Sequence, residues 1–276
     1  MDDAPRIQVV HATAPGCHWS WGYEAVMNRL RMVYGAQIDL HVRIGCPYED
    51  WAQWLIDYEM SEDEAVEWIN GEAAATMGVP LAPVKKGSAP PTVMPASLAT
   101  IAALHQGEET GWRFNRALLR MYAVEAKDPS KPEQMQAAAK EAGLDIKRFQ
   151  ADLTKQEELR AEYEEQSRKG PPVHVGFYNF VVWDGGNRRV ILDYSFDPRD
   201  IEGAIDYLAD GKLKKQRPTD IVGYLAHHGL APLAEIGRVF DFSDGAAALA
   251  AVEKLEKAGK LERVMLAGAP HWRAHA

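Results

Sequence analysis

The sequence predicts a fold of the α/β class, in which helices cover both faces of one sheet and a small second unit follows. Three observations support this prediction. The chain opens with a strand, a helix and a second strand; a long helical stretch comes next; and two strands and a helix return before the C-terminal unit. This order is typical of a sheet with helices on both faces. The composition agrees, because 46% of the 276 residues are hydrophobic and 26% are charged, as in ordinary folded domains.

The opening strand–helix–strand segment has the clearest pattern. Residues 6–13 are rich in β-branched and apolar side chains, as in a buried strand, and Pro15 and Gly16 end it. Residues 18–34 place aromatic and aliphatic side chains on one helical face. Residues 36–44 alternate apolar and polar side chains, which predicts a half-buried strand. Because such crossovers are nearly always right-handed, we expect two parallel neighbouring strands.

Helices are predicted over most of residues 49–170, which form an insertion between the second and third strands. Residues 61–64 (SEDE) have the form of a capping box at the start of a helix that reaches about residue 77. Residues 79–95 hold five prolines and are therefore predicted to be a loop or lid.

Strand character returns after the insertion. Residues 173–183 and 188–194 form a predicted hairpin, and a helix follows from Asp197 to about residue 210. These elements complete a predicted first domain over residues 1–211.

A charged joint at residues 212–217 leads to a predicted second domain over residues 218–276. Three helices and a terminal hairpin are predicted there, in the order of a winged-helix domain. Residues 219–276 carry six Lys and Arg and seven Asp and Glu, so they would neutralise phosphates poorly. We expect this domain to bind a protein partner or to form a homodimer, and not to bind nucleic acid.

Charge and apolar patterning exclude several classes of protein. The formal net charge of −9 argues against binding to nucleic acid or to an anionic membrane, because both need a basic surface. No unbroken apolar run reaches 18 residues, so we expect no membrane span. The N-terminus lacks the basic start and the apolar stretch of a secretory signal. Together with a count of only two cysteines, these features predict a cytoplasmic protein.

Cys17 is the residue most clearly placed for chemistry. It follows a buried strand and stands at the first turn of a predicted helix. Free backbone N–H groups and the helix dipole stabilise an anion there, which would lower the pKa of the thiol. An accessible thiolate of this kind attacks disulfides and other soft electrophiles. The alternative is a small buried cysteine that fills a gap in the core.

The segment around Cys17 also carries a resemblance. Residues 15–24 (PGCHWSWGYE) resemble the C-P-W-C-W-G-F-E segment of DsbA-like protein-disulfide isomerases and oxidoreductases of the thioredoxin superfamily. Residues 94–98 (MPASL) resemble the start of that family's helical insertion, residues 176–180 (GFYNF) its G-F-P-T-F loop, and Asp197-Pro198 its last helix. The resemblance covers about residues 6–210 and implies a thioredoxin fold with a large helical insertion.

Two residues beside Cys17 depart from the family's pattern. Ser20 stands where the family has its second cysteine, so the usual dithiol bridge cannot form. The resemblance therefore implies a monothiol site, with Cys17 as nucleophile and Ser20 as a hydrogen-bond donor to its thiolate. His18 replaces the usual proline. A cationic His18 would lower the pKa of Cys17, and a neutral His18 could carry a proton. The alternative is that His18 is a solvent-facing helix residue.

A third departure lies in the strand region, where Tyr178 stands at the position of the family's cis-proline. A cis peptide before a non-proline residue costs about 3–4 kcal/mol, so we expect a trans peptide and a remodelled loop. The resemblance makes Phe177 and Tyr178, together with His18 and Trp19, the expected substrate-binding residues. The lost proline weakens the case for ordinary oxidoreductase activity.

Cys46 is the second thiol, at the end of the second strand. Parallel strands end on one side of a sheet, so Cys46 could act as a displaced resolving cysteine if it approached Cys17; otherwise it is an inert thiol. Cys17, His18 and Cys46 are a soft ligand set for copper or zinc. Adjacent Cys17 and His18 do not match the usual ligand spacings, so we predict no metal site.

Thiol–disulfide exchange through Cys17 in the cytoplasm is the leading functional prediction. Its substrate would be a disulfide or a thiol, and glutathione or another small thiol, or Cys46, would complete the turnover. No cofactor beyond such a thiol is predicted. The alternatives are a redox-inactive adaptor or binding protein, and a glutathione-dependent isomerase or transferase.

Overall fold

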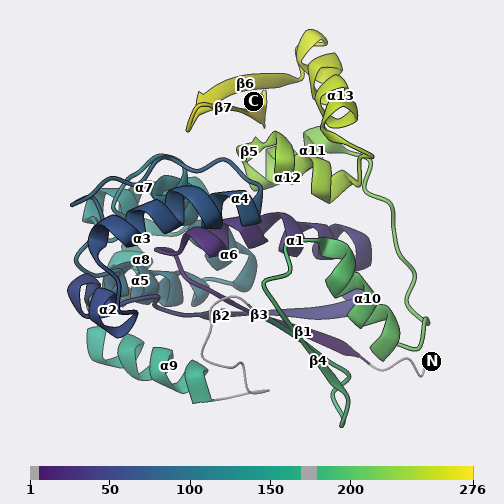
Figure 1. Cartoon of the computed structure of the whole chain (residues 1–276). Coiled ribbons are helices and arrows are strands. Elements are labelled where there is room, and N and C mark those ends of the chain that lie inside the picture. Colours follow the sequence, from purple (N-terminus) through teal and green to yellow (C-terminus); the bar gives the residue numbers. More distant parts are fainter. Residues whose placement is uncertain (1–5, 169–178, 276) are drawn as a thin grey trace.

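The structure is a computed structural model that describes residues 6–168 and 179–275. Its central element is a four-stranded mixed sheet with the strand order β2-β1-β3-β4 (Figure 1). β1 and β2 run parallel with Ile7 opposite Ile38, whereas β3 is antiparallel to both β1 and β4. The strands are β1 (Ile7–Thr13), β2 (Ile38–Ile44), β3 (Asn179–Trp183) and β4 (Arg189–Asp193). The predicted α/β class is confirmed.

Helices α1 (His18–Tyr34) and α10 (Pro198–Leu208) bury the apolar stripe of the sheet. Val9 of β1, Met27 of α1 and Ile205 of α10 are fully buried in one shared hydrophobic core. This packing positions the start of α1, which follows directly from β1 through a short turn. The N-terminus of α1 is therefore held rigidly at one end of the sheet.

The predicted helical insertion is present between β2 and the position of β3. Its helices are α2 (Trp51–Asp57), α3 (Glu62–Trp68), α4 (Ala74–Met77), α5 (Met94–Leu104), α6 (Glu108–Ala123), α7 (Pro132–Ala142), α8 (Ile146–Leu153) and α9 (Gln156–Arg168). Helices α5 to α9 build a second hydrophobic core, and α5 and α9 contact β2.

The helix predicted from residue 61 to about residue 77 is interrupted. Its capping box is present, since the Ser61 N–H donates to Glu64 Oε2 at 2.8 Å and the Glu64 N–H donates to Ser61 Oγ at 3.3 Å. Ile69–Ala73 then form a π-helical turn between α3 and α4. Such turns place one extra residue in a helix and often occur at functional sites.

The C-terminal unit has the predicted three helices and terminal hairpin. A short strand β5 pairs with β7, so the small sheet has the order β5-β7-β6. The predicted second helix begins two residues late, because Ala231 and Pro232 belong to β5. The elements are α11 (Ile221–His228), β5 (Ala231–Pro232), α12 (Leu233–Phe240), α13 (Gly245–Lys257), β6 (Leu261–Leu266) and β7 (Ala269–Ala274). Its assignment as a winged-helix domain remains a prediction.

A buried polar network joins this unit to the first one, where α12 packs on α1 (Figure 1). Arg116 of α6 donates to Glu24 at 2.9 Å and to Glu235 at 2.8 Å, and all three side chains are almost fully buried. Arg116 also donates to the carbonyl oxygens of His228 and Leu230. Because one guanidinium links α1 to α11 and α12, the two units are fixed to each other.

Some predictions fall on residues outside the described ranges. Phe177, Tyr178 and the peptide bond before Tyr178 are among them. Within the described residues, none of the helices combines the length and the apolar character that crossing a membrane requires.

Candidate functional site

Cys17 occupies the predicted position at the start of α1. It is the N-cap residue of the helix, with an extended backbone (φ −120°, ψ 119°). Its N–H donates to the carbonyl oxygen of Ala14 at 3.1 Å, which closes the turn after β1. The strand–turn–cysteine–helix arrangement inferred from the sequence is thus confirmed.

The surroundings of Cys17 differ from the expected exposed, low-pKa thiolate. The residue is only 4% exposed, and burial raises the pKa of its thiol. The Ser20 N–H, the Ser20 hydroxyl and the Trp19 N–H lower the pKa, but the cost of burying a thiolate outweighs them. The expectation is corrected on this point: the helix N-terminus is present, but the sulfur has little contact with solvent.

Ser20 is completely buried beside Cys17. Its Oγ accepts a hydrogen bond from the Ala14 N–H at 3.0 Å, and its hydroxyl and N–H both lower the pKa of the Cys17 thiol. Its hydroxyl thus favours the thiolate form of Cys17, as expected for a neighbouring donor, while the direct hydrogen bond to the sulfur stays a prediction. Ser20 also ties the first turn of α1 to the end of β1, which is a structural role that the sequence did not reveal.

His18 is 8% exposed and packs against Tyr122, with the ring centroids 4.5 Å apart. Burial lowers the pKa of its imidazole to about 4. The ring is therefore neutral near pH 7, so the cationic option is excluded. The solvent-facing option is also wrong, because Tyr122 of the insertion covers the ring.

Trp19 is buried and forms one wall of the site. Its indole stacks on Phe196 with ring centroids 5.6 Å apart, and it also contacts Trp68 and Tyr194 at 5.6 Å each. Trp19 lies in the lining of a groove beside Cys17.

Cys46 is a buried, free thiol in a different core. Its Sγ donates to the Tyr48 carbonyl oxygen at 3.0 Å, and burial raises its pKa to about 12. Cys17 belongs to the core of the sheet and α1, whereas Cys46 belongs to the core of the insertion, and neither is in a disulfide. Within residues 6–168 and 179–275, no group of three or more His, Cys, Asp or Glu side chains could hold a metal ion.

The groove beside Cys17 is narrow and aromatic. Its free volume is about 40 Å³, which is room for little more than one water molecule. Two walls from different parts of the chain meet there: the start of α1, and the insertion with its π-helical turn. The lining residues are Gly16, Cys17, His18, Trp19, Pro47, Tyr48, Trp51, Trp54, Trp68, Ile69, Ala73 and Tyr122.

One wall continues to the surface as a row of four aromatic rings, which we term the aromatic ladder (Tyr48, Trp51, Trp54 and Tyr58). Tyr48 is tilted against Trp51, and the three outer rings stack on one another. Successive ring centroids lie 5.2, 4.9 and 4.5 Å apart. The ladder runs from Tyr48, which is 7% exposed, to Tyr58, which is 59% exposed. The sequence signal for the ladder is the spacing of Trp51, Trp54 and Tyr58 along one helical segment.

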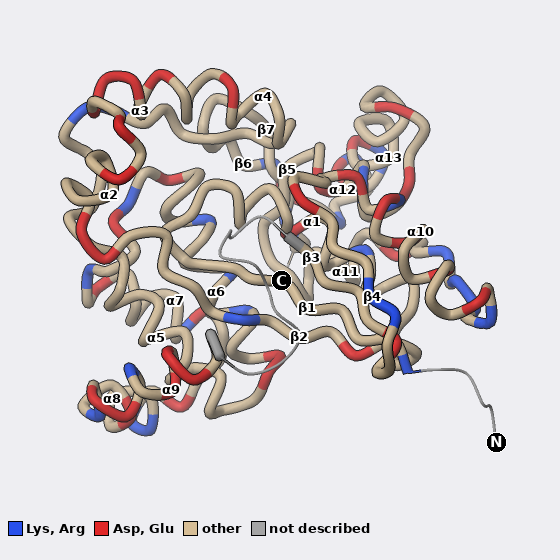
Figure 2. The backbone as a smooth tube through the Cα atoms, turned by 60° about the horizontal axis from the view of Figure 1, so that its bottom comes forward, with Lys and Arg blue, Asp and Glu red and all other residues tan. Residues whose placement is uncertain are grey.

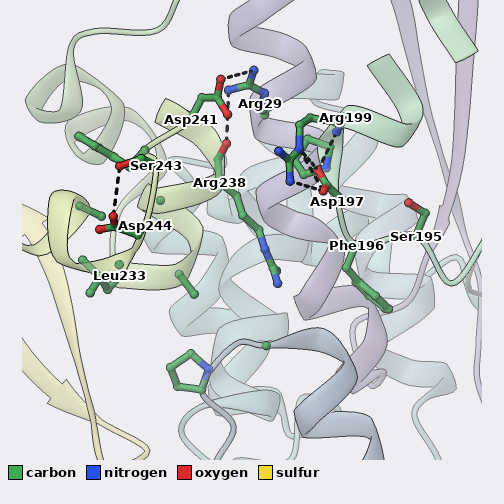
Figure 3. A pocket seen from close by; sticks show the side chains of 18 of the residues that line it. Arg29, Ser195, Phe196, Asp197, Arg199, Leu233, Arg238, Asp241, Ser243 and Asp244 are labelled. Carbon is green, nitrogen blue, oxygen red and sulfur yellow. Dashed lines mark hydrogen bonds and ion pairs between the residues drawn. The ribbon is translucent and has the colours of Figure 1, made fainter. Parts of the chain in front are cut away.

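A much larger cavity, of about 1170 Å³, lies where the start of α10 faces α12 and α13 (Figure 3). Its charged side chains mostly pair with each other: Arg29 with Asp241, and Arg199 with Asp197. This cavity could not be predicted from the sequence, because its walls come from segments far apart in the chain. The mutual pairing leaves no clear preference for a ligand of either charge.

Comparison with known proteins places the chain in a family. The family profile described as Thioredoxin matches residues 13–164, more than half of the chain, so the chain belongs to the thioredoxin family. This result agrees with the resemblance found in the sequence around Cys17.

Two curated relatives share the description "ClpXP adapter protein SpxH". The protein from Halalkalibacterium halodurans is 25% identical over 94% of this chain and 86% of its own length. The protein from Shouchella clausii is 27% identical over 91% of this chain and 80% of its own length. Both matches are long enough to include much of the C-terminal unit.

Solved structures show the same fold at lower identity. The cytosolic disulfide reductase DsbM from Pseudomonas aeruginosa aligns with a TM-score of 0.52 at 19% identity, over 74% of this chain and 95% of that chain. A probable DsbA oxidoreductase from Streptomyces coelicolor aligns with a TM-score of 0.53 at 17% identity, over 78% of this chain and 95% of that chain. At this level of identity the likeness concerns the fold alone.

Proposed function

We propose that this protein is an adaptor that binds other proteins through non-covalent contacts and does not depend on thiol–disulfide exchange. The observation that carries the proposal is the burial of Cys17, whose thiol has a raised pKa and no second cysteine at position 20. Exchange requires an accessible thiolate and a group that resolves the mixed disulfide. The described site supplies neither.

The curated relatives support the same proposal. Their shared description is that of an adaptor, and they match this chain over more than nine-tenths of its length. The C-terminal unit, which we propose to be a winged-helix docking domain, is fixed to α1 by the Arg116 network. Two units held in one orientation suit a protein that presents separate surfaces to separate partners.

Monothiol exchange through Cys17 is the second candidate, and one observation favours it. The Ser20 and Trp19 N–H groups and the Ser20 hydroxyl each lower the pKa of the Cys17 thiol, although burial raises it. They would stabilise a thiolate if the groove opened. The Cys17 thiolate would then attack a disulfide substrate, forming a mixed disulfide and releasing one thiol. Glutathione or a similar small thiol would attack the mixed disulfide, which frees Cys17 and leaves the other half of the substrate bonded to the small thiol. A cytoplasmic location suits both candidates, because free thiols persist there.

Binding to purified ClpXP, measured for the wild type and for Cys17→Ala, separates the two candidates. We expect both proteins to bind with dissociation constants within about twofold of each other, because the adaptor surface does not need the thiol. Cys46→Ala serves as the matched control. The proposal fails if the wild type does not bind ClpXP, or if Cys17→Ala alone loses binding while the wild type reduces a glutathionylated peptide.

A further inference from the structure

We propose that the aromatic ladder and the acidic helices around it form a docking surface for a basic, Lys/Arg-rich segment of a partner protein. This inference rests on the proposed adaptor function and names the chemistry of one partner. It concerns helices α2 and α3 of the insertion, and not the segment around Cys17.

The first line of support is the shape of the ladder. The rings of Trp51, Trp54 and Tyr58 follow the spacing of one helical face and stack on one another, and the outermost ring is largely exposed. The indole Nε1 of Trp51 is buried and has no hydrogen-bond partner among the described residues. A peptide carbonyl that entered the groove would accept this bond.

The second line of support is the distribution of charge. Residues 51–84 carry seven carboxylates and no Lys or Arg, so they account for seven of the nine net negative charges of the chain. Figure 2 shows Asp and Glu residues along α2 and α3 at one side of the molecule. Elsewhere the charges nearly balance. The carboxylates are Asp57, Glu59, Glu62, Asp63, Glu64, Glu67 and Glu72.

Several of these carboxylates already have structural partners. Glu64 caps α3 through Ser61, Asp63 pairs with Lys86 at 2.7 Å, and Glu62 accepts the Gly87 N–H at 2.9 Å. The carboxylates of Glu59, Glu67 and Glu72, in contrast, make no hydrogen bond or ion pair within the described part of the chain. Three exposed negative charges therefore remain for a partner.

Glu72 links the acidic surface to the groove. It lies close enough to Tyr194 to help raise the pKa of that phenol, and Tyr194 contacts Trp19 in the wall of the site. Tyr58, at the exposed end of the ladder, also helps to raise the pKa of Tyr194. Aromatic faces and negative charges thus meet at one place on the surface.

This combination selects cationic side chains. A guanidinium or ammonium group over a Trp or Tyr face gains a cation–π interaction, and nearby carboxylates attract the same charge. An acidic surface repels nucleic acid and anionic membranes. The occupant that fits is therefore a protein segment in which Arg or Lys alternates with apolar residues.

Fluorescence anisotropy of a labelled twelve-residue peptide of alternating Arg and Leu tests the proposal on the full chain. We expect Trp54→Ala, and separately the triple variant E59Q/E67Q/E72Q, to weaken binding about tenfold or more. The triple variant changes only exposed side chains without structural partners, so it tests the surface even if Trp54→Ala destabilises the helix. Binding should weaken as NaCl rises from 0.05 to 0.5 M.

Matched controls carry equivalent changes elsewhere. Tyr207→Ala removes an exposed ring of α10, and E133Q/E157Q/E158Q removes three exposed charges of α7 and α9. Both should bind the peptide within twofold of the wild type, and an alternating Glu and Leu peptide should not bind. The proposal is overturned if the ladder and charge variants bind like the wild type, or if the controls lose as much affinity.

This assay contains no ClpXP, so the two proposals can fail separately. If the protein binds ClpXP but the ladder variants bind the peptide as well as the wild type does, only the docking surface is refuted. If the ladder variants weaken peptide binding but the protein does not bind ClpXP, only the adaptor function is refuted.

Discussion

At position 17 two opposing effects act on one sulfur atom. The start of α1 supplies backbone donors that favour a thiolate, and burial disfavours it. The sequence predicted the helix start, because strand, turn and helix signals are local. It left burial as an alternative, because residues far along the chain, such as Tyr122 of α6, also line the groove at Cys17.

His18 makes folding stability depend on pH. Burial lowers the pKa of its imidazole to about 4, below the ordinary value of 6.5 in the unfolded chain. The unfolded state therefore binds more protons between these pH values, so stability rises as the pH goes from about 4 to about 6.5. The change would be about 3 kcal/mol in full. Urea unfolding at several pH values should show this slope, and His18→Gln should reduce it.

Ser20→Ala removes both an acceptor and a donor from the buried turn. The Ala14 N–H loses its partner, so we expect about 1–3 kcal/mol of destabilisation in urea unfolding. The pKa of Cys17 should rise further, because the hydroxyl that favours the thiolate is gone. Ser243→Ala changes an exposed serine and should alter neither quantity.

At the scale of elements, the sequence predicted the order of strands and helices well. Periodicity and capping signals are local, so the Ser61 capping box and the helical insertion were visible. The π-helical turn at Ile69–Ala73 was not visible in the sequence, because this turn depends on packing against α1, which is far away in the chain. The aromatic ladder was missed for a related reason: a Trp periodicity alone does not show which face is covered.

Gly16 sits where the turn before α1 meets the start of α5. A Cβ at this position would lie 2.3 Å from Val93 Cγ1, a distance at which one of the two must move. We expect Gly16→Ala to cost about 1–3 kcal/mol in urea unfolding, as other overpacking substitutions do. Gly203→Ala in α10 meets no neighbour within 4 Å and should be neutral or stabilising. Equal effects of the two substitutions would contradict this account of the turn.

At the scale of the whole molecule, one guanidinium joins the two units. Arg116 holds two buried carboxylates, and the sequence could not reveal this because Glu24, Arg116 and Glu235 lie about 90 to 210 residues apart. The three C-terminal helices and the terminal hairpin were predictable from their own sequence pattern. The packing of α12 on α1 was not predictable from the sequence.

Arg116→Met tests this junction. It leaves Glu24 and Glu235 buried without their cation, so we expect a loss of about 3–5 kcal/mol, or independent unfolding of the C-terminal unit. Differential scanning calorimetry would show a lower or a split transition. Arg273→Met, which removes an exposed pair with Glu262, should leave the transition unchanged. An unaltered single transition in Arg116→Met would show that the network does not hold the units together.

The central claim is that Cys17 is a buried structural thiol, and its alkylation measures this most directly. The rate of iodoacetamide labelling at Cys17, followed by peptide mass spectrometry in a Cys46→Ala background between pH 6 and 10, gives both its accessibility and its pKa. We predict slow labelling, far below that of the unfolded chain, with an apparent pKa above the ordinary value of about 8.5. Rapid labelling with an apparent pKa below that value would contradict the account and favour monothiol exchange.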